Sequence, residues 1–226
     1  MRRNFVKKLK MKSTKELFYK LTLPSKKWQH YFDIYDRHFS PFIGKTPNVL
    51  EIGVDKGGSL ELWHNFFENS MLYAIDNNAE TKNIKFPFRV DIEIGDQDDE
   101  MFLKHYVSSR PDFDIIIDDG GHYMQQQLMS LIYLFPKLRE GGIYVIEDVH
   151  TSYSKGYGGG FRNPNTFVEH CKSLVELLNV EFITDVNPPD DLAKLFFDLN
   201  SITFYNSVIV LEKKTRPKIL PANVNC

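Results

Sequence analysis

Three consecutive isoleucines that lead directly into charged residues are the feature that most constrains the fold of this chain. Residues 114–122 read Asp-Ile-Ile-Ile-Asp-Asp-Gly-Gly-His. A run of β-branched apolar residues is typical of a strand that is buried on both faces. In an open parallel sheet, ligands bind at the carboxyl ends of the strands, so Asp118, Asp119 and His122 indicate a functional site at a strand exit. A solvated Asp-Gly turn fits this stretch equally well when it is taken alone.

Further short apolar segments extend this pattern along the chain. We predict strands over residues 48–54, 71–76, 90–94, 143–146, 180–186 and 201–211. Apolar residues at helical spacing predict helices over residues 60–67, 124–135, 166–178 and 192–199, and an aromatic-rich helix over residues 28–43. Strands that alternate with helices predict a doubly wound α/β sheet of seven strands, with one antiparallel strand at its edge.

Length and composition are those of a soluble protein with one main domain. The 226 residues are enough to enclose a full core, and their mean hydropathy is -0.34. No segment has the length of a transmembrane helix, and the N-terminus lacks the apolar stretch of a signal peptide. The two cysteines, Cys171 and Cys226, form neither a disulfide framework nor a zinc motif, which favours a reducing compartment. We therefore expect a cytoplasmic location.

Charge is distributed unevenly between the N-terminus and the rest of the chain. Residues 1–27 hold ten lysines and arginines against the single Glu16, whereas the whole chain has a net charge of -2. The acidic remainder argues against nucleic acid as a partner. We predict a basic N-terminal extension over residues 1–27 and a folded domain over residues 28–226. The extension is interpreted as a solvated segment or a linker, and contact with an anionic membrane or a second subunit is the alternative.

Two strand exits near the N-terminus have the pattern of a nucleoside site. Glu51, Gly53 and Gly57 mark a strand, a tight turn and a helix start, where a ligand can approach bare backbone. The next predicted strand ends in Asp76, about 25 residues after Glu51, close to the spacing at which Rossmann-like folds present an acid to a ribose. The two features together are much more specific than either one alone.

Four motifs together resemble the class I S-adenosylmethionine-dependent methyltransferases, over nearly all of residues 45–211. The branch that fits best contains the metal-dependent macrolide-sugar O-methyltransferases of the macrocin and mycinamicin type and the rhamnosyl O-methyltransferases. The motifs are Leu-Glu-Ile-Gly-Val at 50–54, Gly-Asp-Gln at 95–97, Ile-Asp-Asp-Gly-Gly-His at 117–122 and Val-Ile-Glu-Asp at 145–148, followed by Thr-Ser-Tyr at 151–153.

The chain departs from this branch in two places. Gly121 stands where a serine or alanine is common, and a short basic N-terminus stands in place of a larger N-terminal domain. The second departure leaves the acceptor and the oligomeric state open, with a homo-oligomer as one outcome.

The resemblance implies a Rossmann-like fold that binds S-adenosyl-L-methionine. Its methionine end would meet the turn after the first strand, its ribose would meet Asp76, and its adenine would face residues 96 and 97. The full set of candidate cofactor-binding residues is Glu51, Gly53, Gly57, Ser59, Asp76, Asp96, Gln97 and Asp118.

The resemblance also implies a divalent ion held by Asp119, Glu147 and Asp148, with His122 as the base. His150, after the next strand exit, is a second candidate base from its position in the sequence. Physical chemistry agrees with these roles, because three carboxylates at neighbouring strand exits repel one another unless a cation lies between them. Carboxylate oxygens suit Mg²⁺, Mn²⁺ or Ca²⁺ rather than Zn²⁺. Such an ion could hold two adjacent sugar hydroxyls and lower the pKa of one of them.

The resulting hypothesis is O-methylation of a sugar hydroxyl, on a glycan or glycosylated metabolite that offers a vicinal diol. A catechol-like acceptor and a scaffold that binds the cofactor without turnover are the alternatives. Residues 187–190, Asn-Pro-Pro-Asp, resemble a motif of amino-methylating enzymes. They follow the wrong strand and end in an acid rather than an aromatic residue, so we interpret them as a proline turn.

Overall fold

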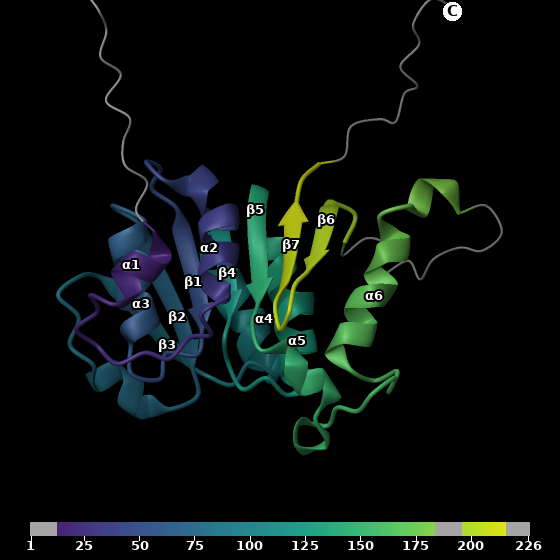
Figure 1. The fold of residues 1–226 in the computed structure, drawn as a ribbon, viewed down its shortest axis with the longest axis horizontal. Helices are drawn as coiled ribbons and strands as arrows, with labels where there is room; N and C mark the ends of the chain where they lie inside the picture. Colours follow the sequence, from purple (N-terminus) through teal and green to yellow (C-terminus); the bar gives the residue numbers. More distant parts are fainter. Residues whose placement is uncertain (1–12, 184–195, 216–226) are drawn as a thin grey trace, which may run out of the picture.

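The computed structural model describes residues 13–183 and 196–215, which form a sheet covered by helices on both faces (Figure 1). The strand order is β3-β2-β1-β4-β5-β7-β6. The first five strands are parallel, and β7 runs antiparallel to both of its neighbours. The strands are β1 Asn48–Ile52, β2 Met71–Asp76, β3 Val90–Ile94, β4 Phe113–Asp118, β5 Leu138–Ile146, β6 Leu199–Phe204 and β7 Ile209–Lys213. The predicted seven-stranded α/β fold is confirmed.

Helices of the described segments lie in two layers. Helices α4, α5 and α6 pack on one face of the sheet, and α2 and α3 pack on the other, with α1 against both of them (Figure 1). The helices are α1 Thr14–Phe18, α2 Tyr31–Phe39, α3 Gly58–Phe66, α4 Glu100–Ser109, α5 Met124–Leu134 and α6 Phe167–Leu177. Short 3-10 helices are η1 Ser40–Phe42, η2 Ala79–Asn83, η3 Phe135–Lys137, η4 Val149–Tyr153, η5 Lys155–Tyr157 and η6 Val180–Phe182.

The isoleucine run of β4 explains why the sheet is covered on both sides. Ile116 points into the core beneath α4, α5 and α6, whereas Ile115 and Ile117 point into the core beneath α2 and α3. All three side chains are fully buried. Because side chains alternate along a strand, an uninterrupted apolar run is needed here, and β4 is the central strand that the sequence predicts.

The C-terminal strands differ from the prediction. The strand predicted at 180–186 is wrong for residues 180–182, which form η6, and residues 184–186 lie outside the described part. The segment predicted as one strand, 201–211, is the β6–β7 hairpin, which turns where Tyr205 N–H donates to Val208 O. The polar Asn206-Ser207 pair at the turn, with Ser207 at φ +67°, is the missed signal.

Two further expectations at this end change accordingly. The antiparallel strand β7 lies between β5 and β6 rather than at the edge of the sheet. The helix predicted at 192–199 is not formed at its described end, because residues 196–198 make a turn and Leu199 begins β6. Its first residues, 192–195, and the Asn-Pro-Pro-Asp motif at 187–190 lie outside the described residues.

Residues 13–27 pack against the domain, so the solvated extension expected there is wrong for this segment. Thr14 is fully buried, and both its backbone N–H and its hydroxyl lie within hydrogen-bond distance of Asp36 Oδ1, at 2.8 and 2.7 Å. This contact fixes the start of α1 on α2. No helix of the described segments has the length and apolar character needed to cross a bilayer.

Replacing Thr14 by valine tests whether α1 is part of the cooperative fold. Valine keeps the volume and removes the hydroxyl that bonds Asp36, so we expect Thr14→Val to lower the free energy of unfolding by about 1–2 kcal/mol. Denaturant titration measures this change. Lys15→Ala, at an exposed neighbouring position, is the control and should stay within about 0.5 kcal/mol of the wild type. An unchanged midpoint for Thr14→Val would mean that α1 does not contribute to stability.

Candidate active site

Backbone hydrogen bonds align three strand exits beyond the last strand residues. Gly53 N–H donates to Ile75 O at 2.8 Å, Asp119 N–H to Ile52 O at 3.0 Å, and Glu147 N–H to Asp118 O at 2.9 Å. The sheet therefore continues by one residue past β1, β4 and β5. Gly53, Asp119 and Glu147 are consequently placed in a row along its carboxyl edge.

Gly53 is required by its position in this row. Its backbone has φ +91°, and a Cβ atom built there would lie 2.2 Å from the backbone oxygen of Asp119. An L-amino acid would be strained by the dihedral angle and would also collide with backbone that cannot move aside. The glycine of the first motif is therefore explained by how closely the exit of β4 approaches the exit of β1.

A cavity of about 350 Å³ lies along this edge, over the exits of β1, β2, β3 and β4. Five of the eight candidate cofactor residues line it: Gly53, Ser59, Asp76, Asp96 and Gln97. Asp119, Gly120 and Gly121 close its side. The position between β1 and β4 is where the strand order reverses, which is the usual ligand crevice of an open α/β sheet.

The other three candidates, Glu51, Gly57 and Asp118, do not line the cavity but shape its walls. Glu51 is fully buried and accepts hydrogen bonds from Ser59 Oγ and Trp63 Nε1 of α3. Gly57 precedes α3 with a left-handed backbone, φ +82°. Burial raises the pKa of Glu51 to about 7.

Asp118 contacts the glycine turn after β4 indirectly, through the side chain of Gln97. Gln97 donates from Nε2 to Asp118 Oδ1 at 3.1 Å, and its Oε1 accepts from Gly121 N–H at 2.8 Å. Burial raises the pKa of Asp118 to about 7. The amide of Gln97 thus joins the end of β4 to the glycine turn, which orients the residues that follow.

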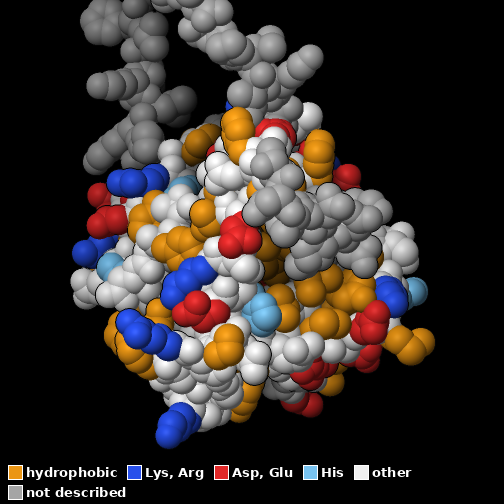
Figure 2. All heavy atoms as spheres, turned by 90° about the vertical axis from the view of Figure 1, so that its right-hand side faces the viewer, with side chains coloured by type: hydrophobic (Ala, Val, Ile, Leu, Met, Phe, Trp, Pro, Cys, Tyr) orange, Lys and Arg blue, Asp and Glu red, His pale blue; other side chains and the backbone are white. Residues whose placement is uncertain are grey.

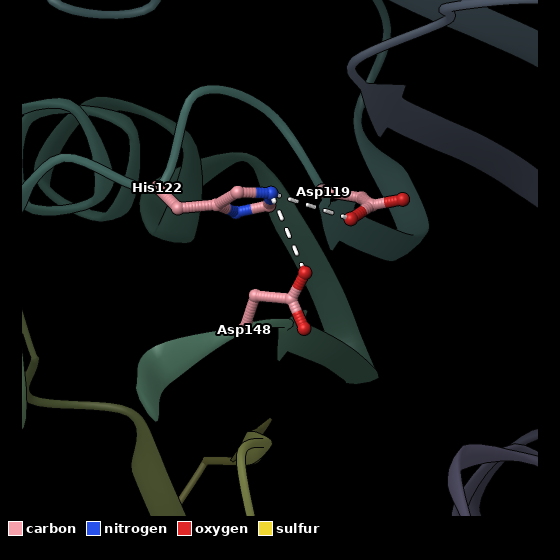
Figure 3. A group of neighbouring side chains, drawn as sticks. All are labelled: Asp119, His122 and Asp148. Carbon is pink, nitrogen blue, oxygen red and sulfur yellow. Dashed lines mark ion pairs between the residues drawn. The ribbon is translucent and has the colours of Figure 1, made fainter. Parts of the chain in front are cut away.

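Asp119, His122 and Asp148 converge at the same edge (Figure 3). The Nε2 atom of His122 lies 3.8 Å from Asp119 Oδ1 and 3.6 Å from Asp148 Oδ2. One potential ligand atom from each residue lies within 4.8 Å of the other two. His122 and Asp148 both have left-handed backbones, with φ +60° and +54°.

Burial favours the neutral form of the His122 imidazole. Burial lowers its pKa below the usual value, although the charges of Asp119 and Asp148 act in the opposite direction. The buried Nδ1 atom has no hydrogen-bond partner among residues 13–183 and 196–215. A neutral imidazole with Nε2 facing two carboxylates can accept a proton or bind a cation.

Glu147 is placed differently from the other two acids. Its side chain is 1% exposed, Tyr35 donates its hydroxyl to Oε1 at 2.7 Å, and Lys27 Nζ lies 2.8 Å from Oε2. The same ammonium lies 2.5 Å from Asp119 Oδ2. Burial raises the pKa of Glu147 above its usual range, although Lys27 opposes the shift. Of the three predicted metal ligands, Asp119 and Asp148 converge with His122, whereas Glu147 is not part of that group and is joined to Asp119 through Lys27.

Sequence reasoning missed the side chains that support the acids. Tyr31 donates its hydroxyl to Asp148 Oδ1 at 2.5 Å, just as Tyr35 donates to Glu147. The spacing of four residues between these tyrosines on α2 was a usable signal, because it places both on one face. Lys27 gave no such signal, because it is one of many lysines in a basic segment.

His150 lies on the far side of Asp148. Its side chain is half exposed, its Nδ1 lies 2.5 Å from Ser207 Oγ, and the same atom lies 3.8 Å from Asp148 Oδ1. It lines a second hollow, of about 520 Å³, between η4, α6 and the β6–β7 hairpin. This hollow is on the side of the molecule that carries α6, where hydrophobic side chains gather (Figure 2). The two candidate bases, His122 and His150, therefore occupy different environments.

Comparison with known proteins gives relatives that are named as O-methyltransferases. The chain is 38% identical over 154 residues to the demethylmacrocin O-methyltransferase of Streptomyces fradiae, which covers 64% of this chain and 38% of that protein. It is 33% identical over 198 residues to the 8-demethyl-8-(2-methoxy-alpha-L-rhamnosyl)-tetracenomycin-C 3'-O-methyltransferase of Streptomyces olivaceus, which covers 82% of this chain and 50% of that protein. No family model matches the chain.

Among solved structures, the MycE methyltransferase of mycinamycin biosynthesis, in complex with Mg, SAH and mycinamycin VI, matches with a TM-score of 0.80. The identity is 29%, over 94% of this chain and 57% of MycE. This chain is a homologue of the sugar O-methyltransferases. It has the class I methyltransferase fold, which an O-methyltransferase from Bacillus cereus shares at 15% identity and a TM-score of 0.52. This methyltransferase homologue spans about half the length, or less, of the two curated relatives above.

Replacing Gly53 by alanine tests the close approach of the two strand exits. We expect Gly53→Ala to lower the free energy of unfolding by about 1–3 kcal/mol more than Gly44→Ala does. Gly44 is a matched control, because it has a similar φ of +78° and nothing within 4 Å of an added Cβ atom. The difference between the two variants in denaturant titration isolates the collision with Asp119. Equal losses would show that only the dihedral angle matters.

Proposed function

We propose that this chain is a divalent-metal-dependent O-methyltransferase that transfers a methyl group from S-adenosylmethionine to a sugar hydroxyl. The convergence of Asp119, His122 and Asp148 at the rim of the cavity is the observation that carries the proposal. Asp119 belongs to both places, since it lines the cavity and faces the imidazole. Relatives that methylate macrolide and rhamnosyl sugars support the same reaction.

The cavity suits the proposed cofactor in position and in the groups that line it. Asp76 lies at the end of β2, where this fold presents an acid to ribose hydroxyls. Its two carboxylate oxygens are fixed by backbone N–H groups of Val54 and Asn78, each at 2.7 Å, so its orientation is set before a ligand arrives. Asp96 and Gln97 follow β3 and would face the adenine.

The donor set at the rim suits a hard divalent cation. Asp119 and Asp148 would hold the ion; the His122 imidazole faces both of them, and Glu147 is joined to Asp119 through Lys27. Carboxylates are the ligands that Mg²⁺, Mn²⁺ and Ca²⁺ prefer. With all three acids ionised, they and the Lys27 ammonium together carry a net charge of two negative units, which one such ion would neutralise.

In this mechanism the residues of the chain orient the acceptor and move its proton. A bound divalent cation would lower the pKa of an acceptor hydroxyl that it contacts. His122 Nε2 accepts the proton of that hydroxyl, because burial favours the neutral imidazole and Nε2 faces Asp119 at the rim. Asp148, oriented by the Tyr31 hydroxyl, stabilises the imidazolium that forms. The cavity walls hold the methyl donor beside this point, so that the oxygen and the methyl carbon meet in line.

The acceptor proposed is a sugar with two adjacent hydroxyls, since such a diol can contact one cation through both oxygens. A deoxyhexose such as rhamnose, in a glycan or glycosylated metabolite, fits this requirement. The cytoplasmic location, membrane contact by the basic N-terminus and a homo-oligomer stay predictions.

Chelation is the direct test of metal dependence. We expect methyl transfer from S-adenosylmethionine to a rhamnoside to stop on addition of EDTA and to return with excess Mg²⁺ or Mn²⁺. Mass spectrometry of the acceptor measures the transfer, and catechol serves as the comparison acceptor. Transfer that is unaffected by EDTA would contradict the metal, and transfer to catechol alone would contradict the sugar.

A pair of histidine variants tests the proposed base. We expect His122→Asn to lower kcat by about 10²–10⁴-fold, the usual contribution of a general base. Asparagine is chosen because it tolerates the left-handed backbone at this position. His150→Asn is the matched control and should retain kcat within a few-fold. If His150→Asn produced the larger loss instead, the base assignment would pass to His150.

A further inference from the structure

We propose that Lys27 is a positioning residue that favours cofactor binding and opposes ion binding, because it ties a wall of the cofactor cavity to the acids of the ion site. The inference rests on the proposed function and names a residue whose role the sequence did not reveal. The wall is a strap, residues 22–27, which crosses the start of α3 on its way to α2.

One end of the strap is fastened to α3. The buried Glu61 carboxylate accepts hydrogen bonds from the backbone N–H of Thr22 and of Leu23, the latter at 2.8 Å, and from the Thr22 hydroxyl at 3.0 Å. The strap also lies directly on Gly58, where an added Cβ atom would be 2.4 Å from the backbone oxygen of Pro24. The first end is therefore fixed by hydrogen bonds and by close packing.

The middle of the strap forms part of the cavity surface. Pro24, Ser25 and Lys26 line the cavity together with residues at the exits of β1 and β2. A ligand that fills this cavity therefore contacts both the strap and the strand ends. Its affinity depends on the strap keeping its position, because a loose wall must be ordered when the ligand binds.

The other end is fastened by Lys27 alone among the charged residues of the strap. The Lys27 side chain is 2% exposed, and its ammonium lies 2.5 Å from Asp119 Oδ2 and 2.8 Å from Glu147 Oε2. Burial by itself would lower the pKa of Lys27, but the charges of Asp119 and Glu147 outweigh this and raise it above its usual range. Lys26, the adjacent residue, is exposed.

The two carboxylate oxygens of Asp119 have different neighbours, one on the strap and one in the proposed ion site. Oδ2 contacts Lys27, whereas Oδ1 faces His122 and the side occupied by Asp148. A divalent cation held at this edge would share Asp119 with the ammonium and would be repelled by it. Removing the ammonium would leave the buried Glu147 and the partly exposed Asp119 without a counter-charge, which also favours an added cation.

Lys27→Met tests the inference, since methionine keeps the length and removes the charge. By isothermal calorimetry on the full chain we expect Mg²⁺ or Mn²⁺ alone to bind at least about 10-fold more tightly than to the wild type. S-adenosylhomocysteine, titrated separately without metal, should bind about 5-fold or more weakly. A role limited to folding would weaken both ligands, so the opposite signs are the distinguishing result.

Three further variants complete the design. Lys20→Met makes the same charge change at an exposed position just before the strap. It should alter neither the ion affinity nor the S-adenosylhomocysteine affinity. Lys27→Arg retains the charge and should restore cofactor affinity and weak ion binding. Glu61→Gln loosens the opposite end of the strap and should weaken S-adenosylhomocysteine while leaving ion affinity unchanged, which also tests the strap if Lys27→Met does not fold.

The outcomes separate this inference from the proposed function. If Lys27→Met leaves the ion affinity unchanged, lowers both affinities or leaves S-adenosylhomocysteine binding unchanged, the role of Lys27 is overturned whether or not the chain transfers methyl groups. If the wild type binds both probes with the expected variant pattern but methylates no sugar, the function fails and the inference stands. A wild type that binds neither probe overturns both.

Discussion

The row of Gly53, Asp119 and Glu147 at the carboxyl edge of the sheet is the constraint on which the site depends. Backbone hydrogen bonds extend the sheet by one residue at each of these exits, so the spacing of the acids is set by the spacing of strands rather than by flexible side chains. Neighbouring strands lie about 4.8 Å apart, which brings carboxylates into repulsive proximity. The other residues of the site offset that repulsion with hydrogen-bond donors and a positive charge.

The groups that offset the repulsion between the acids come from three elements that are distant in the sequence. Helix α2 provides the tyrosine hydroxyls that bond Glu147 and Asp148, the strap provides the Lys27 ammonium, and the turn after β4 provides His122. Each carboxylate that is shielded from water therefore has a donor or a cation beside it, as buried charge requires. We propose that a divalent cation completes this balance and gives the site its chemistry.

The sequence predicted the central features and missed those set by tertiary contacts. The isoleucine run identified β4, and the acids after it identified the edge where the cavity lies, because strand periodicity and parallel topology are local and general rules. The β6–β7 hairpin was read as one strand because its turn, Asn206-Ser207, lacks the glycine that usually marks such a turn. Lys27 was not found, because a buried lysine and a solvated one are identical in sequence until the partner acids are located.

The most direct measurement is a crystal structure of the full chain with Mn²⁺ and S-adenosylhomocysteine, with the metal located by its anomalous scattering. The account predicts one Mn²⁺ peak at the carboxyl edge of the sheet, within about 2–2.6 Å of oxygens from both Asp119 and Asp148, with His122 beside it and the nucleoside in the cavity over β1 and β2. The absence of a metal peak there, or a nucleoside bound away from Asp76 and Asp96, would contradict the account.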